Sequence, residues 1–549
     1  MCPLMRRNRF VASAMMVVAA LASARPLAAS GGLRVAVAQA RHEVSRDFSR
    51  TVPLNAGQAL AIDHSNGNID VRVQPGRDAQ IQAKIRVSAE SEAEAAQFAQ
   101  RIAIEIRERP AGVLVQTVYP SMDRMLGRRN ISFAVDYTIT MPDSASLDVH
   151  NRFGNVIVAG LRRAVTIVNG NGRVGATDLH GGGRIENSFG AVEVARVTGA
   201  LILTNGNGAV SVTDVNGPTT ITDRFGNITI RGIRGPLSVT STNGAVEIGD
   251  ARAGATVSNS FGPVKISEID GDTTVTNGNG TVDARALRGA AELNTSFGAI
   301  SATDIAKTLR IVAPNSRIAV TKAGGSVSVK GAYAPVELRD IGADATVEAT
   351  NSAVTLDNVR GRVTSSTSFA ATRLHTVSGE VKVVSQNGDV TISDIGGGAY
   401  VRTSFGSVQA DRVGGSLTVD NGNGGIRTTA IKGSVNLKTT FAGVWVKDVS
   451  GRVDVRNQNG TVEASIAPSH PCADVILTTS FAPIRVGLPD GIGFTVSAHT
   501  SFGRVNSELP ITTSGDLSAT ALRGSIAGGG CAVTLSNSTG DIVITKLLR

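Results

Sequence analysis

The chain has 549 residues and a formal net charge of +9 at pH 7, with 62 Gly and only 4% aromatic residues. Val, Thr, Ile, Asn and Gly are prominent, whereas the Leu, Glu and Lys of helical proteins are scarce. This composition excludes a mainly helical chain and predicts β-strands joined by many turns. The mildly basic charge favours an anionic envelope polymer as a partner without identifying one, and we expect no nucleic acid.

The first 24 residues predict a signal peptide. Three Arg residues in "MRRNRF" precede the apolar stretch "VASAMMVVAALASA", and Ala22-Ser23-Ala24 offers a small-residue cleavage site. A membrane anchor is the alternative, but the apolar run is short for a span. We therefore expect an exported protein that is periplasmic, cell-surface or secreted, with no transmembrane segment after cleavage. The mature chain would carry 51 − 45 = +6 charges.

Residues 25–44 are expected to be a linker, and residues 45–150 a small α+β head that caps the first unit of a repeat array. Alternating apolar residues predict strands over 59–76, 79–89 and 131–142. Residues 91–106 predict a helix, with Ser88 or Ser91 as its N-cap.

Residues 151–466 contain the repeat that defines the fold class. Asn recurs in steps of 36 between aromatic residues that recur in the same steps, and the two series interleave at 18. The aromatic series is Phe153, Phe189, Phe225, Phe261, Phe297, Tyr333, Phe369, Phe405 and Phe441, and the Asn series is Asn171, Asn207, Asn243, Asn279, Asn315, Asn351, Asn387, Asn423 and Asn459. When the Phe or Asn of each unit is numbered 0, positions 3, 5 and 8 are almost always apolar. The pattern predicts an all-β protein, a β-solenoid (β-helix) of about 18-residue rungs.

Position 0 shares its parity with the apolar positions 12 and 14, so we expect both Phe and Asn to point inward at one corner. A narrow coil could not stack a Phe on every rung, which would explain why Asn alternates with it. The Gly that usually follows permits a positive φ. Units near Ser316, Ala334, Ser352 and Ala370 lack this Gly, so their turns should differ.

A 36-residue coil is the alternative geometry. It would stack acids of position 7, such as Asp178 and Asp214, directly on one another, and like charges in that position repel. In an 18-residue coil Arg196 separates these two acids, although Asp250 then lies beside Glu268. We favour the 18-residue coil.

Residues 467–549 break the period and predict irregular C-terminal rungs and a cap. Cys472 and Cys531 lie 59 residues apart, or about three rungs. In a regular stack they would be roughly 14 Å apart, too far for a disulfide. The irregular end leaves a bridge open.

These features resemble the "putative adhesin" family of bacterial domains, the β-strand-repeat envelope proteins. The resemblance rests on "LAIDHSNGNIDVRV", the recurring NG-x-V and FG-x-V turns, and the C-terminal motifs "TSFGRVNSELP", "LRGSIAGGG" and "STGDIVI". It covers roughly residues 45–549. It implies an exported β-solenoid, and it supplies no catalytic residues.

Candidate sites are few, and we expect no catalytic, cofactor-binding or metal-binding residues. The acids of position 7 could form a cation ladder, but their carboxylates more often accept from turn amides. Trp445 should point outward, where it could stack on a sugar ring. A cluster of basic residues with few nearby acids could bind an anionic polymer, although a solvated basic stretch is the simpler interpretation. This possible anion-binding patch comprises Arg310, Arg317, Lys322 and Lys330, near Lys307.

The sequence therefore predicts a non-enzymatic binding or scaffold protein of the cell envelope, with an envelope or surface polymer or protein as its partner. One alternative is a carbohydrate-active β-helix lyase or hydrolase. That enzyme would need a local cluster of polar residues out of register with the repeat. A second alternative is an accessory factor in envelope stress signalling.

Overall fold

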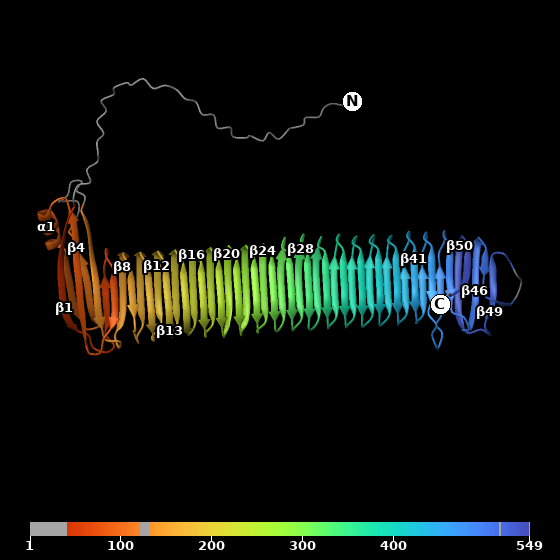
Figure 1. Ribbon diagram of the computed structural model, residues 1–549, viewed down its shortest axis with the longest axis horizontal. Coiled ribbons are helices and arrows are strands. Elements are labelled where there is room, and N and C mark those ends of the chain that lie inside the picture. Colours follow the sequence, from red (N-terminus) through yellow and green to blue (C-terminus); the bar gives the residue numbers. More distant parts are fainter. Residues whose placement is uncertain (1–40, 121–130, 515–517, 548–549) are drawn as a thin grey trace, which may run out of the picture.

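The computed structural model describes residues 41–120, 131–514 and 518–547. They form one straight rod, with α1 (Glu92–Arg101) and its neighbouring strands at the N-terminal end (Figure 1). The signal peptide and most of the linker lie outside the described residues. Apart from α1, the elements in these ranges are β-strands and short turns, so the all-β solenoid is confirmed.

The rod is built from two parallel sheets that run along its length. Odd-numbered strands from β9 (Val156–Ala159) to β45 (Ile484–Leu488) form sheet A, and even-numbered strands from β8 (Ser146–Phe153) to β44 (Val475–Thr478) form sheet B. Residues pair with those 18 positions on, as in Val174 with Val192. The 18-residue rung is thereby confirmed and the 36-residue coil is excluded.

Each rung fills its interior with apolar side chains from both sheets. In one rung Val192, Val194 and Val197 of β13 (Val192–Thr198) are buried, as are Leu201 and Leu203 of β14 (Leu201–Asn207). The step of three between positions 5 and 8 results from a left-handed residue at position 7, where φ is 56° at Asp178 and 54° at Arg196. Asp and Asn tolerate this conformation better than most residues, which gives the acidic column a conformational cause.

The expectation that Phe and Asn at position 0 point inward is wrong. Phe225 is 53% exposed, whereas Asn205, at position 16 of the preceding unit, is 1% exposed. The chain turns directly after position 16, and the alternation of the strand ends there. Position 0 therefore lies on the outside of the corner.

A ladder of buried amides takes the inner side of this corner. Asn169 Nδ2 donates to Asn187 Oδ1 at 3.1 Å, and Asn187 Nδ2 donates to Asn205 Oδ1 at 3.2 Å. Each of these amides also donates to the carbonyl three residues on, as Asn205 does to Gly208 at 2.9 Å. An amide can accept from one rung and donate to the next, so it satisfies buried corner groups at every step.

The corner glycines are required where the rungs approach closely. Gly190 has φ of 124°, and a Cβ there would lie 2.2 Å from the carbonyl oxygen of Gly172. In the central units that lack this Gly, the residue at position 0 itself takes a positive φ, as in Asn315 (59°), Tyr333 (61°) and Asn351 (53°). The expectation that these turns differ is confirmed.

The head places antiparallel strands beside the first rungs. Strand β4 (Asp78–Ala89) pairs with β1 (His42–Pro53) and β7 (Ser132–Met141), while β3 (Ile69–Val73) continues sheet A to β9. The N-cap of α1 is Ser91, which accepts from Glu94 N.

The helix is shorter than the 91–106 that the sequence predicted. Residues Ala103–Arg109 form β5, which pairs with β6 (Gly112–Val118). Ile104 and Ile106 alternate with charged residues there, so the period of two defines a strand beyond Arg101.

The C-terminal rungs are not stacked in chain order. Strand β50 (Cys531–Thr539) lies between β44 and β46 (Phe494–Phe502), and β51 (Ile542–Lys546) lies between β45 and β47 (Val505–Ser507). Beyond them, β49 (Ala521–Ile526) pairs antiparallel with β46 and β48 (Thr512–Thr513).

This exchange of rung order joins two cysteines that the sequence placed apart. Cys472 precedes β44, and Cys531 begins the strand that lies against β44. Their Cα atoms are 5.9 Å apart and the pair forms a disulfide. The expectation of a separation near 14 Å is wrong, because it assumed that successive rungs stack in chain order.

We predict that Cys472→Ser loosens the C-terminal rungs without changing the regular array. The bridge closes a loop across a separation of 59 residues, and such a loop is worth roughly 4 kcal/mol in the chain-entropy treatment. Hydrogen exchange should rise in β50 and β51 and stay unchanged near β20 (Gly254–Phe261). Faster exchange along the whole rod would contradict this.

We predict that Asp223→Asn stabilises the protein above pH 6 and has little effect near pH 4. Asp223 accepts from Asn205 at 3.0 Å, and burial raises the pKa of its carboxyl to about 6. The folded state therefore retains a proton that the unfolded chain loses near pH 4, so stability falls as pH rises between these values. Asn would continue the ladder without charge, a gain of about 1–3 kcal/mol at pH 8. Equal urea midpoints for both proteins at pH 8 would reject this.

Candidate binding surface

A row of aromatic side chains stands outside the coil on every second rung. Their exposed fractions run from 51% at Phe261 to 68% at Tyr333. We call this row the aromatic ridge, and it comprises Phe153, Phe189, Phe225, Phe261, Phe297, Tyr333, Phe369, Phe405 and Phe441. Successive aromatics are two rungs apart, or about 9.6 Å.

The strand register places the ridge residues on one line along the rod. Phe189 pairs with Asn207, Asn207 with Phe225, and Phe225 with Asn243. The Asn residues between the aromatics are exposed or half-buried. The ridge therefore alternates a large aromatic ring with a short polar side chain.

The alternation continues where the chain order of the rungs is broken. Phe481 (66% exposed) lies beside Thr539, whose amide donates to Ser480 O at 2.7 Å. Thr539 pairs in turn with Phe502, which is 79% exposed. The order Phe, Thr, Phe is thus kept in space although it is not kept in sequence.

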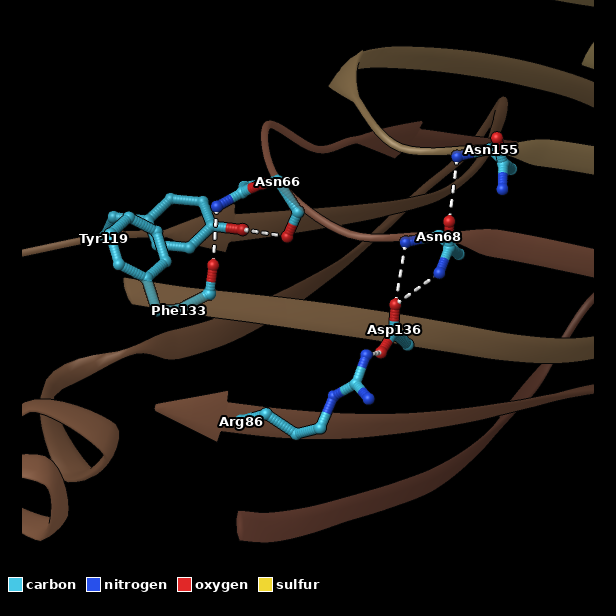
Figure 2. Close-up of polar contacts among 7 residues, drawn as sticks. All are labelled: Asn66, Asn68, Arg86, Tyr119, Phe133, Asp136 and Asn155. Carbon is cyan, nitrogen blue, oxygen red and sulfur yellow. Dashed lines mark hydrogen bonds and ion pairs between the residues drawn. The ribbon is translucent and has the colours of Figure 1, made fainter. Parts of the chain in front are cut away.

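The N-terminal end of the ridge meets a polar network of the head (Figure 2). Asn66 bridges to Phe153, and its side chain donates to Phe133 O at 2.6 Å. Asn68 Oδ1 accepts from Asn155 N at 2.9 Å, while the Asn68 side chain donates to Asp136 at 2.9 Å. The head thereby fixes the first corner.

Small residues flank the aromatics of the ridge. Gly or Ala follows each aromatic, and Ser, Thr, Ala or Arg precedes it. From Thr242–Ala245 to Ser296–Ala299, the four corner residues of each rung carry no charge. Beside Phe189 and Phe225 the surface is hollowed by about 600 Å³. The rings therefore stand clear of their surroundings along a largely uncharged edge.

The predicted anion-binding residues lie on different parts of the rod. Arg310 of β26 (Leu309–Pro314) and Lys330 of β28 (Val327–Ala332) belong to sheet B, Lys322 of β27 (Ile318–Ala323) belongs to sheet A, and Arg317 lies at the corner before β27. A role for these residues in binding remains a prediction.

The premise that these cations have few nearby acids is wrong. Each forms an ion pair with an acid of another rung: Arg310 with Glu292 (3.6 Å), Arg317 with Glu337 (2.9 Å), Lys322 with Asp304 (2.9 Å) and Lys330 with Glu348 (3.0 Å). Three of the four acids are 18 residues away, a distance that the coil closes. Exposed pairs of this kind contribute little to stability.

The acids of position 7 also pair across rungs. Arg196 Nε lies 2.6 Å from Asp178 Oδ1, and the guanidinium lowers the pKa of that carboxyl. Arg412 lowers the pKa of Asp394 in the same way. The ranges that the structure describes contain no group of three or more His, Cys, Asp or Glu residues placed to hold a metal.

Trp445 lies outside sheet A as expected, with 38% of its surface exposed. The Arg427 guanidinium lies 5.3 Å from the centre of its ring. One face of the indole is therefore covered by a side chain of the neighbouring rung, which weighs against a free sugar platform.

One histidine departs from the surface or turn position expected of it. His64 is 2% exposed, and its Nδ1 lies 3.0 Å from Thr117 Oγ1, which contacts the Tyr137 hydroxyl at 2.6 Å. Burial lowers the pKa of His64 to about 4 and raises that of Tyr137 to about 12. These groups are sealed within the head and fix its packing.

No family profile and no curated protein matches the chain. Three solved structures are similar to it at low identity. A putative cell adhesion protein from Clostridium sporogenes is 7% identical, with 91% of this chain and all of that chain covered and a TM-score of 0.12. Putative adhesins from Bacteroides fragilis (13% identical; 52% and 94% covered; TM-score 0.14) and Parabacteroides distasonis (9%; 76% and 97%; 0.12) are the others.

At such TM-scores, the likeness carries no argument about fold or function. It agrees in kind with the family that the sequence resembles. Among the described residues, no helix is long and apolar enough to cross a membrane.

We predict that Phe225→Ala changes the free energy of unfolding by no more than about 0.5 kcal/mol, because the ring is exposed. Ile230→Ala, in the core of β17 (Ile228–Ile233), is the matched control and should cost about 2–4 kcal/mol. Urea denaturation of both variants checks the pair. A loss at Phe225 as large as that at Ile230 would show that the ridge supports the fold.

Proposed function

We propose that this protein is an exported, non-enzymatic binding protein of the cell envelope, with the aromatic ridge as its binding surface. The observation that carries the proposal is the unbroken alternation of exposed aromatics and short polar residues along the rod. A coil does not need these rings for its own packing. Large exposed apolar surfaces of this kind mark interaction sites.

Export is supported by the N-terminal sequence and by the disulfide. Residues 1–24 have the charged, apolar and small-residue segments of a signal peptide. The disulfide between Cys472 and Cys531 fits an oxidising compartment, where such bonds persist. A periplasmic, cell-surface or secreted location follows from this proposal.

The groups with strongly shifted pKa values favour binding over catalysis. His64 and Tyr137 are sealed in the head, and Asp223 belongs to the buried amide ladder. Shifted pKa values often mark catalytic groups, but a substrate could not reach these three. The carbohydrate-active enzyme therefore has no supporting observation among the described residues.

We predict that the triple variant Phe189→Ser, Phe225→Ser and Phe261→Ser binds envelope preparations at least about tenfold more weakly, because truncated aromatic anchors lose much of the binding energy. Cosedimentation of the mature protein with washed envelopes measures this. Ile202→Ser is the matched control, since Ile202 is 44% exposed on sheet B but lies off the ridge.

A quadruple variant that neutralises Arg310, Arg317, Lys322 and Lys330 tests the alternative binding patch in the same assay. If the patch binds an anionic polymer, salt should weaken the association and this variant should lose it. Unchanged association of the ridge variant would reject the ridge as the binding surface. Turnover of an envelope polysaccharide by the purified protein would reject the non-enzymatic proposal itself.

A further inference from the structure

We infer that the partner of the aromatic ridge is the ridge of a second copy of this chain, and that two rods pair side by side in antiparallel orientation with their aromatic rings interdigitated. This inference rests on the proposed function, because it identifies the partner of the same surface. The geometry of the ridge, its area and its charge each support it.

The spacing of the aromatics makes the ridge complementary to itself. Neighbouring rings are about 9.6 Å apart, and a ring placed midway between them would lie about 4.8 Å from each. Aromatic pairs favour centroid separations of 4.5–7 Å. Asn207 and Asn243, which flank Phe225, leave the midway position free above short side chains. Two copies offset by one rung would therefore fill each other's gaps.

An identical partner keeps this match along the whole rod. Two copies have the same rung spacing, so rings that interdigitate at one rung also interdigitate at the next. A two-fold axis perpendicular to the rods makes the contact closed and equal for both copies, and it runs them antiparallel. A ligand of another kind would have to share the two-rung period to engage every ring.

The exposed aromatic surface is large enough for a stable dimer. Nine ridge residues, each at least half exposed, present on the order of 1,000 Å² per copy. Monomeric proteins rarely expose apolar patches beyond about 300–600 Å². Two such ridges would bury about 2,000 Å² in total, at the upper end of standard interfaces.

The charge and chemistry of the ridge favour an apolar partner. The corner residues from Thr242 to Ala299 are uncharged, so two copies approach there without like-charge repulsion. Eight of the nine aromatics are Phe, which has no polar group to bond a sugar hydroxyl, and Tyr333 is the exception. These features favour ring-to-ring contact over recognition of an anionic or heavily hydroxylated polymer.

The test is the oligomeric state of the mature chain across the micromolar range. Sedimentation velocity should show a dimer, and small-angle scattering should show a thicker cross-section with little increase in length. The variant Phe189→Ser, Phe225→Ser and Phe261→Ser should raise the dissociation constant at least about tenfold. Controls off the ridge, Ile202→Ser and Trp445→Ser, should dimerise as the parent does, and circular dichroism confirms that each variant folds.

A gap-filling variant separates interdigitation from general stickiness. Asn207→Phe with Asn243→Phe places rings at the vacant rungs, where the corner and its Gly are the same as at the Phe rungs. Interdigitation predicts weaker dimerisation, because the partner's rings lose their places. A dimer strengthened by the added rings would overturn the inference, and so would a monomer at every concentration or an end-to-end dimer.

The outcomes for the partner and for the function are distinct. A monomer that binds envelopes through the ridge would overturn the second copy as partner and leave the proposed function standing; chitin oligosaccharides and phospholipid vesicles would then identify the class of ligand. A ridge-dependent dimer whose ridge variant still binds envelopes would support the pairing and reject the ridge as the envelope-binding surface.

Discussion

The structure depends on one constraint: each residue stacks on the residue 18 positions away, at the spacing of neighbouring strands. A side chain therefore meets its counterpart in the adjacent rung about 4.8 Å away. Apolar columns meet this condition by packing, and amides meet it by donating in one direction and accepting from the other, as Asn187 does. Exposed charges meet it by alternating in sign, as with Asp178 and Arg196.

The sequence predicted the parts of the fold that follow from this periodicity. The rung length, the inward columns at positions 3, 5 and 8, and the separation of Asp178 from Asp214 by Arg196 all come from counting in steps of 18. Errors arose where local geometry interrupts the count. The disulfide was missed because β50 enters between β44 and β46, an order of strands that no spacing in the sequence reveals.

The binding surface was the hardest part to predict, because the Phe column was assigned by parity. Parity assumes a straight strand, but the chain turns after the buried amide, so that Asn205 lies inside and Asn207 outside. The Gly after position 0 was the available signal, since it marks a corner rather than a strand. Likewise, the acids that pair with Lys322 and Lys330 were overlooked because they are distant in sequence and adjacent in the coil.

The two ends of the rod show which directions of association the structure leaves available. A solenoid exposes the edges of its sheets at both ends, and such edges can template further strands. Here antiparallel strands lie at both ends: β1, β4 and β7 at the head, and β48 and β49 at the C-terminal end. With the sheet edges occupied, growth along the axis is disfavoured. The long corner has no such cover, because its aromatics lie outside the coil from Phe153 to Phe441 and continue at Phe481 and Phe502. A protein that closes its ends and leaves an apolar edge exposed is built to associate laterally, and the alternation of ring and gap gives that association a register.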